Sequence, residues 1–404
     1  MTTAAGIHLY DDLTARAFEP FALTRPAGEL RAGALLVRER WTRALGGDAV
    51  GHLTAAHLAG FTEPGAPPVL GEGTLPAGAW VVNARFAPAL AAAPDADQLM
   101  AEGEVVAIRL AEALPVARLA DGSASLSALA SPSRRTGEIA GWFMHAVWDY
   151  VGHLVPMLDD DLPRLGATLP QGLPPGTIGI GTHPVFVEAG AVVEPMTCLD
   201  TSAGPILLRA GSHALAFTRL VGPLYVGADS TVMGDRIAAS SIGDVCKVHG
   251  ELSNTIFVGH ANKGHDGFVG HSILGRWVNL GAGTITSNLK NTYGTVQLWT
   301  PTGIEETGLQ FLGTLFGDHA KTGIGLRLTT GTVLGAAANV YGSEMPPKAV
   351  APFAWGEAGR FAVYRSDKFL EVAARMMARR HVPLTDASRA QLLASYDARW
   401  SAEG

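Results

Sequence analysis

Three polar residues, His265, Asn279 and Asn288, interrupt a stretch of the chain that is otherwise rich in apolar and small residues. The stretch reads GHDGFVGHSILGRWVNLGAGTITSNLKN and runs from Gly264 to Asn291. A histidine has an unperturbed pKa of about 6.5, so it can take a proton from a reacting group at neutral pH. We therefore expect the functional site of this part of the chain to lie in this segment.

The same segment carries a repeat that indicates the elements holding these residues. Pairs of an aliphatic residue and a glycine (Val269-Gly270, Leu274-Gly275, Leu280-Gly281) recur every five or six positions. That period is too short for a helical solenoid and predicts a parallel β-helix of hexapeptides, whose thin coils must stack to bury a core. The pattern extends from about residue 178 to 350 and is broken between 291 and 316, where we expect a loop to leave the coil. Such β-helices coil left-handed, against the usual crossover rule.

The rest of the chain predicts two further regions. Strand-like runs at 7–10, 79–82 and 105–108 alternate with helical spacing, for example at 26–45, which favours an α/β domain with a parallel sheet. Residues 138–165 also read as helical. We expect an α/β domain at 1–168, a Pro- and Gly-rich linker, the β-helix at 177–355 and a C-terminal helical segment at 356–404. The helices at 366–380 and 386–400 are expected to cover the open end of the β-helix, which otherwise exposes strand edges.

Composition excludes several classes of function. The net charge of −7 is unsuited to a nucleic-acid partner, because phosphate backbones are bound by clustered Lys and Arg. Two cysteines cannot form a disulfide framework and fit a reducing compartment. The N-terminus does not read as a signal peptide, and no apolar run reaches the length of a membrane span. We therefore expect a cytoplasmic protein without a membrane partner.

From His265 to Asn288 the chain resembles bifunctional N-acetylglucosamine-1-phosphate uridyltransferase/glucosamine-1-phosphate N-acetyltransferases. The order of a histidine, F-V-G and N-L-G-A-G-T-I-T-x-N is present without a gap. Nearly the whole chain is similar to a family of sugar nucleotidyltransferases with a β-helix half. The motifs behind this are LTRPAGELRAG, Asn83-Ala84-Arg85, Trp148-Asp149, GHANKGHDGFVGHSILGRW, SNLKN, TGLQFLG, GDHAKTG, TGTV and PPKAVAPFAWG.

The resemblance implies roles for the residues of the β-helix. His265 takes the position of the base that deprotonates the amine, and Asn279 and Asn288 take those of residues that contact and orient the amino-sugar. Acetyl-CoA would be the acyl donor and would lie in a groove between two subunits, which implies a homotrimer. The backbone of Gly281, Ala282 and Gly283 would lie near the thioester.

Two positions differ from the family pattern, and further residues are candidates for contact with the substrate. Phe268 stands where the better-known enzymes carry a tyrosine, so a hydroxyl contact to the sugar is missing. Ser253 stands where they carry a phosphate-binding lysine, for which Lys263 could substitute. The remaining candidates for substrate contact are Arg236, His319 and Lys321.

Structural roles are the alternative for each of these residues. Asparagines at β-helix corners form amide ladders, and a single histidine is often structural. A zinc site of the carbonic anhydrase type would use two histidines five apart, as His260 and His265 are, but the third histidine is missing at the required spacing. We expect no metal in the β-helix.

The N-terminal half lacks the G-x-G-[ST]-x-M loop of related uridyltransferases. A phosphate could instead bind where Pro26 begins the predicted helix, a position that proline favours. The candidates for nucleotide binding are Thr24, Arg25, Arg31, Asn83 and Arg85, with Asp11 or Asp12 in the same crevice. Mg²⁺ would be the cation for nucleotidyl transfer. The alternative is that the charges of 29–39 form ion pairs on a helix surface.

Together these features predict a sugar-nucleotide enzyme that acetylates a phosphorylated or nucleotide-linked amino-sugar. Its N-terminal half would bind, and could form, the nucleotide-sugar from a sugar phosphate and a nucleotide. Two alternatives stay open. One is a nucleotidyltransferase whose β-helix is only a scaffold for assembly. The other is a regulatory protein that binds a nucleotide-sugar without turnover.

Overall fold

The computed structural model describes residues 6–131 and 133–400, which form two compact units. The first unit consists of the described residues up to Asp149 together with Thr385–Ala398. The second consists of Tyr150–Leu384 and the described residues from Arg399. Residues 150–168, which the sequence-based bounds place in the first domain, are thus grouped with the second unit.

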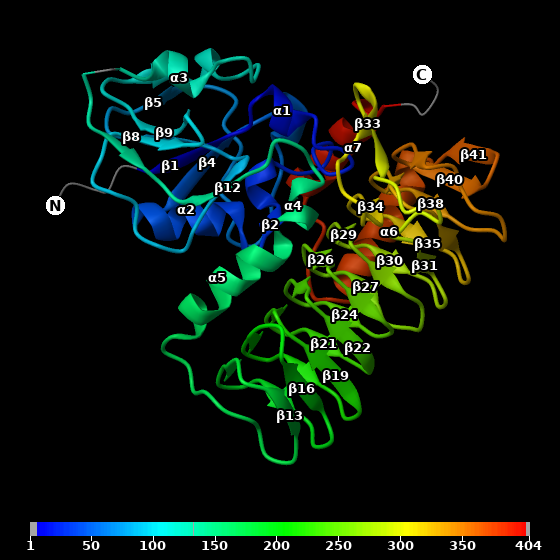
Figure 1. Ribbon diagram of the computed structural model, residues 1–404. Coiled ribbons are helices and arrows are strands. Elements are labelled where there is room, and N and C mark those ends of the chain that lie inside the picture. Colours follow the sequence, from blue (N-terminus) through cyan, green and yellow to red (C-terminus); the bar gives the residue numbers. More distant parts are fainter. Residues whose placement is uncertain (1–5, 132, 401–404) are drawn as a thin grey trace. The chain divides into compact units, whose positions relative to one another are not determined.

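A six-stranded mixed sheet forms the centre of the first unit, in the order β11-β8-β9-β6-β1-β4 (Figure 1). Strands β4, β1 and β6 are parallel, whereas β9 is antiparallel to β6 and β8, in place of the fully parallel sheet expected. The carboxyl ends of β4, β1 and β6 therefore meet at one edge, where open α/β sheets bind ligands. The strands are β1 (Ile7–Tyr10), β4 (Ala49–Leu53), β6 (Trp80–Asn83), β8 (Gln98–Ala101), β9 (Glu104–Arg109) and β11 (Thr136–Glu138).

The expected helix at 26–45 is wrong in its first half. Gly33 adopts a φ of +59° and turns the chain between two short strands, so the helix begins only at Val37. There Glu39 accepts a hydrogen bond from the Leu36 backbone N–H at 2.8 Å, and Gly46 ends the helix at a φ of +66°. The helices of this unit are α1 (Leu13–Arg16), η1 (Ala27–Glu29), α2 (Val37–Leu45), η2 (Ala56–Leu58), η3 (Val116–Arg118), α3 (Leu126–Leu129) and α7 (Asp386–Asp397). The short strands are β2 (Arg31–Ala32), β3 (Leu35–Leu36), β5 (Thr74–Leu75), β7 (Phe86–Pro88), β10 (Leu114–Pro115) and β12 (Gly141–Phe143).

The second unit is a left-handed parallel β-helix, as the hexapeptide repeat predicts, with three long sheets along its sides (Figure 1). The first is formed by β13 (Ile178–Gly181), β16 (Cys198–Thr201), β19 (Thr218–Val221), β22 (Asp235–Ala238), β25 (Leu252–Ser253) and β28 (Val269–Gly270). The second is formed by β14 (Val185–Val187), β17 (Ile206–Leu208), β20 (Leu224–Val226), β23 (Ser241–Ile242), β26 (Ile256–Phe257), β29 (Ile273–Leu274), β34 (Thr314–Phe316), β37 (Thr332–Leu334) and β39 (Ala349–Val350). The third is formed by β15 (Val192–Val193), β18 (His213–Ala214), β21 (Thr231–Val232), β24 (Lys247–Val248), β27 (Asn262–Lys263), β30 (Asn279–Leu280), β35 (Lys321–Thr322), β38 (Asn339–Val340), β40 (Ala354–Glu357) and β41 (Arg360–Val363).

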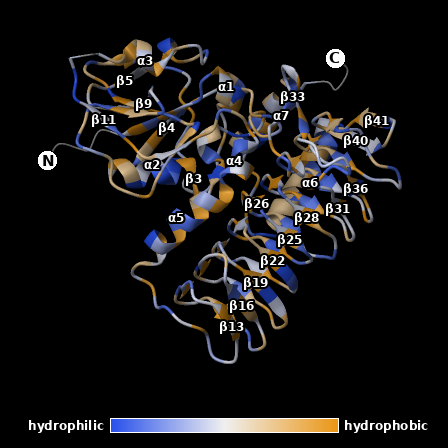
Figure 2. Cartoon of the chain, viewed as in Figure 1, coloured by the Kyte–Doolittle hydropathy of each residue, from blue (hydrophilic) through white to orange (hydrophobic). Residues whose placement is uncertain are grey.

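Aliphatic side chains fill the interior of the β-helix. Leu252, Leu274 and Leu280 are at most 2% exposed and belong to one continuous core cluster. Figure 2 shows hydrophobic and hydrophilic residues side by side on the coil strands, as period-two alternation requires. Because the inward positions are fixed by this core, the outward residues of successive coils are held in register as columns.

The coil is interrupted once, where the sequence predicts a loop. Asn279 pairs in register with Lys321, so the chain between them leaves the coil and returns. The excursion carries an antiparallel hairpin of β32 (Gln297–Thr300) and β33 (Gly303–Glu306). Strand β31 (Ile285–Thr286) precedes it and pairs with β36 (Arg327–Leu328).

The helices outside the coil differ from expectation. Residues 138–165 form α4 (Asp149–Gly152) and α5 (Leu154–Gly166), preceded by strand β12 rather than by helix. Helix α6 (Ser366–Ala378) packs on the β-helix, where the Phe369 ring contacts those of His319 and Phe353 at centroid distances of 5.5 and 5.1 Å. Helix α7 was expected on the open end of the β-helix but belongs to the first unit. Within the described residues, no helix is both long enough and apolar enough to cross a membrane.

Candidate functional site

His265 lies exposed at the corner that links β27 to β28. In this corner Gly267 has a φ of +117°, and a Cβ there would come within 2.2 Å of the Thr284 carbonyl oxygen, so only glycine fits. The Gly283 N–H donates to the Asp266 carbonyl at 3.1 Å. The corner of His265 is therefore stacked on the corner formed by 281–283. The structure thus brings the predicted base and the predicted acyl-donor residues onto neighbouring coils.

The corner of Gly281, Ala282 and Gly283 presents its backbone outward. A Cβ on Gly281 would meet the Gly323 carbonyl carbon at 2.6 Å, so this glycine is needed for close stacking of coils. Gly283 has a φ of +71°, and a Cβ on it would meet nothing closer than 3.6 Å. The N–H groups of Gly281 and Gly283 donate to the Thr322 and Asp266 carbonyls. Ala282 is exposed, and within the described chain no hydrogen bond engages its N–H.

Lys263 is placed inside the corner rather than on its surface. It is 2% exposed, and its Nζ donates to the carbonyl oxygens of His249, at 2.7 Å, and of His265. Burial lowers the pKa of its ammonium to about 8. We therefore assign Lys263 to the support of the corner, because two of the three N–H donors of its buried ammonium are used within the protein.

Two other predicted substrate contacts lie at the first sheet, Arg236 within β22 and Phe268 immediately before β28. The Arg236 side chain is 47% exposed, with Nη1 3.9 Å from Glu251 Oε1. The Phe268 ring covers Gly270, where a Cβ would approach it to 2.4 Å. Arg236 is therefore accessible to a ligand, while Phe268 offers only an apolar edge.

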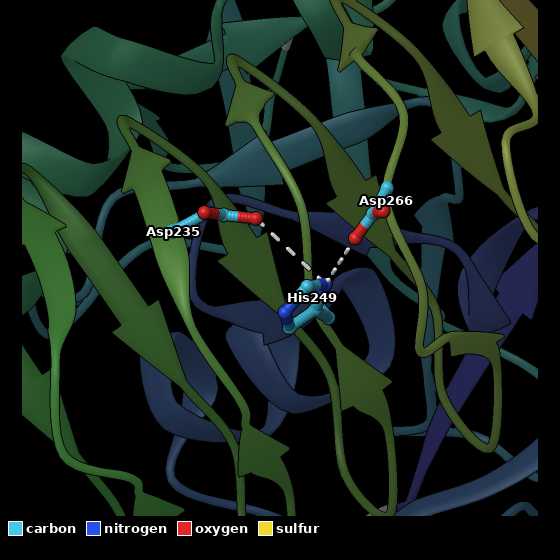
Figure 3. Close-up of side chains that lie close together, drawn as sticks. All are labelled: Asp235, His249 and Asp266. Atoms are coloured by element: carbon cyan, nitrogen blue, oxygen red, sulfur yellow. Dashed lines mark ion pairs between the residues drawn. The ribbon is translucent and has the colours of Figure 1, made fainter.

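Beside His265, two carboxylates flank a histidine that the sequence did not single out. His249 Nδ1 lies 3.8 Å from Asp235 Oδ2 and 3.5 Å from Asp266 Oδ1 (Figure 3). One ligand atom of each residue lies within 4.8 Å of the others, so the group could close around a cation. The carboxylates are 56% and 90% exposed, which equally suits a solvated charge cluster. The recurrence of Asp and His at the same corner of successive coils was the sequence feature that could have revealed this group.

Asn288 lies at a different corner from His265. Its Nδ2 is 2.8 Å from His271 Nδ1, and the other ring nitrogen, Nε2, is 3.0 Å from Asn254 Nδ2. The His271 ring stacks on Phe311 at 5.3 Å, and burial lowers its pKa to about 4. Asn288 is thus engaged with a neutral imidazole that sequence reasoning missed.

Asn279 lies on the third sheet, in a column with Asn262 and Lys321. The Asn262 Nδ2 donates to Asn279 Oδ1 at 2.9 Å, which is the amide ladder foreseen as an alternative. The Lys321 Nζ donates to the His319 carbonyl at 3.2 Å, and burial lowers its pKa to about 8. The His319 ring contacts Trp277 and Phe369 and is 6% exposed.

No hydrogen bond joins His265, Asn279 and Asn288 to one another in residues 6–131 and 133–400. They therefore form no single hydrogen-bonded triad.

In the first unit, a buried polar cluster lies at the carboxyl ends of β1 and β4. Asp11 Oδ2 accepts from the Thr54 hydroxyl at 2.5 Å and from the Ala27 N–H at 3.1 Å. Asp11 is 2% exposed, and burial raises the pKa of its carboxyl. Asp12 caps α1 and forms an ion pair with Arg85 at 2.7 Å. Asn83 also donates to Asp12, at 3.2 Å.

The predicted nucleotide-binding side chains are engaged within the first unit. Arg25 is 1% exposed and forms an ion pair with Glu63 at 2.9 Å. Arg31 Nη1 donates to the Ala34 carbonyl oxygen at 2.5 Å. The Thr24 hydroxyl donates to the Phe21 carbonyl oxygen at 3.4 Å. Arg31, Arg85 and Thr24 are each at most 8% exposed. The charges at 29–39 form buried pairs rather than a helix surface, since Glu29 accepts from Arg38 at 2.7 Å and lies 2.9 Å from His52 Nε2.

The contacts of Asp11 and Asp12 decide whether a magnesium ion could bind at this end of the sheet. Asp12 is neutralised by Arg85, and Asp11 is buried against a backbone N–H and a hydroxyl. Neither carboxylate offers the exposed, unneutralised oxygens that Mg²⁺ uses. The residues in this arrangement do not fit the cation.

Comparison with known proteins identifies a family match and two curated relatives. Residues 7–168 match a family described as sugar nucleotidyl transferase, which confirms the resemblance seen in the sequence. A bifunctional sugar-1-phosphate nucleotidylyltransferase/acetyltransferase of Sulfurisphaera tokodaii is 30% identical over 91 residues, 22% of this chain and 23% of that protein. The bifunctional protein GlmU of Methanococcus vannielii is 30% identical over 117 residues, 29% of this chain and 26% of that protein. The chain therefore aligns with 23% and 26% of the length of these curated relatives.

Solved structures show more distant similarity. AntD, an N-acyltransferase from Bacillus cereus in complex with dTDP and 3-hydroxybutyryl-CoA, is 13% identical, with a TM-score of 0.22. It covers 51% of this chain and 93% of its own. A hexapeptide transferase family protein from Anaplasma phagocytophilum is 13% identical, with a TM-score of 0.15, covering 54% and 95%.

Proposed function

We propose that the chain transfers an acetyl group from acetyl-CoA to the amine of a phosphorylated or nucleotide-linked amino-sugar. The observation that carries this proposal is the stacking of the exposed His265 corner on the Gly281–Gly283 corner. This stacking supports the proposal, because His265, the base that we propose, is one coil away from the exposed Ala282, and coils in a β-sheet stack about 4.8 Å apart. The match of residues 7–168 to sugar nucleotidyl transferases supports a sugar nucleotide or sugar phosphate as the acceptor.

The reaction follows from these groups. The amine nitrogen attacks the thioester carbon, a C–N bond forms, and His265 takes the proton that the nitrogen loses. The charge that develops on the thioester oxygen needs a donor, and the Ala282 N–H is the one in the corner that no described residue uses. The C–S bond then breaks, and the CoA thiolate leaves and takes up a proton. In the homotrimer that we propose, a second subunit would complete the donor groove.

Release of CoA from acetyl-CoA with glucosamine-1-phosphate tests the proposal. We expect His265→Ala to lower kcat by about a hundredfold or more, as general-base catalysis supplies 10²–10⁴-fold. His213→Ala, which removes a half-buried β-helix histidine that pairs with Glu194, should leave kcat unchanged. Equal rates in wild type and His265→Ala would refute the base role. The mass of the particle, measured by sedimentation, would refute the trimer if it equalled one chain of 42.1 kDa.

A second candidate function is nucleotidyl transfer by the first unit, which the family match favours. The engaged arginines speak against it in this conformation. Release of pyrophosphate from UTP or another nucleoside triphosphate with a sugar-1-phosphate and Mg²⁺ tests this function, and His265→Ala should leave it unchanged. Binding of a nucleotide-sugar without acetyl transfer or nucleotidyl transfer would support a regulatory protein instead.

A cytoplasmic location also remains a prediction, for which cell fractionation is the test.

A further inference from the structure

A small cavity of about 180 Å³ lies in the second unit, between the third sheet of the β-helix and the end of α6. Strands β24, β27 and β30 supply one wall, and the residues around the end of the helix supply the other. The lining residues are Lys247, His260, Asn262, Trp277, Val278, Asn279, Met376, Arg379 and Arg380.

The cavity is surrounded by positive charge. Lys247, Arg379 and Arg380 line it, and no carboxylate does. Within the described chain these three cations form neither ion pairs nor side-chain hydrogen bonds. By contrast, Arg375 on the same helix is paired with Glu371 at 3.5 Å. Three unpaired cations around one small space repel each other unless an anion lies between them.

The uncharged polar groups of the cavity also suit an anion. Asn279 uses its Oδ1 to accept from Asn262, which leaves its Nδ2 as a donor. The two amides could be assigned the other way round, but an amide pair of this kind leaves one NH₂ group in either case. Guanidinium, ammonium and amide N–H groups together match the acceptor oxygens of a phosphoryl group.

A purely structural role explains only part of this arrangement. Arg379 and Arg380 follow the end of α6, where cations favourably oppose the negative end of the helix dipole. That effect does not account for Lys247, which comes from β24 on the opposite wall, nor for the amide pair.

We propose that this cavity binds a phosphoryl group. Its volume is below the roughly 300–1,000 Å³ of pockets that enclose a whole ligand, so it fits a head group whose remainder extends outside. Asn262 precedes His265 by three residues, and three residues span at most about 10 Å. A phosphorylated amino-sugar or the phosphates of CoA would supply this group, and either assignment rests on the proposed acetyl transfer.

Calorimetric titration of the full-length protein with inorganic pyrophosphate tests the anion site without any turnover. We expect wild type to bind pyrophosphate, and both Arg379→Gln/Arg380→Gln and Lys247→Gln to bind it at least about tenfold more weakly, because each charged hydrogen bond is lost. Arg375→Gln should bind it as wild type does. Lys247→Gln keeps the helix end intact, so it separates loss of the site from damage to α6. No binding by wild type, or equal affinity in all four proteins, would overturn the proposal.

Titration with glucosamine-1-phosphate and with CoA identifies the source of the phosphoryl group. The ligand whose affinity falls in both cavity variants is the one held there, and unphosphorylated glucosamine should bind the variants and wild type equally. Weaker pyrophosphate binding without weaker binding of either phosphorylated ligand would mean that the cavity holds an adventitious ion only, and would overturn its role as a substrate subsite. Because binding is measured directly, failure of acetyl transfer would not by itself count against the site.

Discussion

His271 makes the stability of the β-helix sensitive to acid. Its ring is held between Asn254 and Asn288 and stacked on Phe311. A neutral imidazole has one N–H donor and one acceptor, so one asparagine must present its oxygen to the ring and the other its NH₂ group. A protonated ring would have two N–H donors and would force the second amide to turn. Since the pKa is lowered to about 4 by burial, the folded protein keeps His271 neutral well below pH 6.

The size of the effect follows from proton linkage. The unfolded chain takes up this proton as pH falls through about 6.5, whereas the folded chain takes it up only near pH 4. The contribution of His271 is therefore fully present above pH 6.5 and is lost as pH falls between these values. Between pH 7 and pH 5 the loss is at most about 1.8 kcal/mol, because the ring is partly accessible.

Urea unfolding at pH 7 and pH 5, followed by circular dichroism, measures this loss. We expect His271→Gln to lose less stability than wild type on acidification, by up to about 1.8 kcal/mol, whatever its stability at pH 7. His183→Gln, which removes an exposed histidine of the same unit, should lose as much as wild type. Equal losses of stability in His271→Gln and wild type would show that the folded protein does not hold the ring neutral.

Three further outcomes are expected. Thr54→Val should destabilise the first unit by about 1–3 kcal/mol in urea unfolding, because buried Asp11 loses a donor, and an unchanged midpoint would contradict this. Gly283→Val should raise KM for acetyl-CoA, because its side chain would project from the outer face of the corner, and should cost about 1–2 kcal/mol of stability for its left-handed φ. Gly190→Val, at a φ of +90° in another corner, should lower stability without changing KM. An equal rise in KM in both variants would contradict binding of acetyl-CoA at the Gly283 corner. EDTA should leave the rate of CoA release unchanged, and a loss that added metal restores would show instead that the reaction needs a cation, for which the Asp–His–Asp cluster of Figure 3 would be the candidate site.

The sequence predicted those parts of the site that follow from the repeat. Hexapeptide spacing fixes which residues point inward, so the coil and a loop that leaves it between 291 and 316 could be foreseen, whereas the stacking of the His265 corner on the Gly281–Gly283 corner emerged only from the structure. The period of the pattern also fixes the outward columns. Residue roles within the columns were harder to foresee, because an asparagine at one position can form an amide hydrogen bond to the asparagine of the next coil or can contact a ligand.

Contacts between distant segments could not be predicted. The ion pair of Arg25 with Glu63 and that of Arg85 with Asp12 join segments far apart in the chain, so arginines that resemble a phosphate clamp are already engaged. The partners of Asn288 were missed for the same reason, since Phe311 returns from the excursion to cover His271. The cationic cavity depends on α6 lying against β24, which neither periodicity nor composition reveals.

The placement of α7 has a consequence for biosynthesis. This helix supplies the first unit with contacts from the far end of the chain, since the Ser395 hydroxyl donates to the Leu23 carbonyl at 2.7 Å and Gln391 Nε2 to that of Thr24 at 3.4 Å. Tyr150–Leu384, which belong to the β-helix unit, must leave the ribosome before α7 does. At about 5–20 residues per second the nascent first unit waits tens of seconds without its last helix. The β-helix can stack coil by coil during that interval, so the unit that begins first is the one that is finished last.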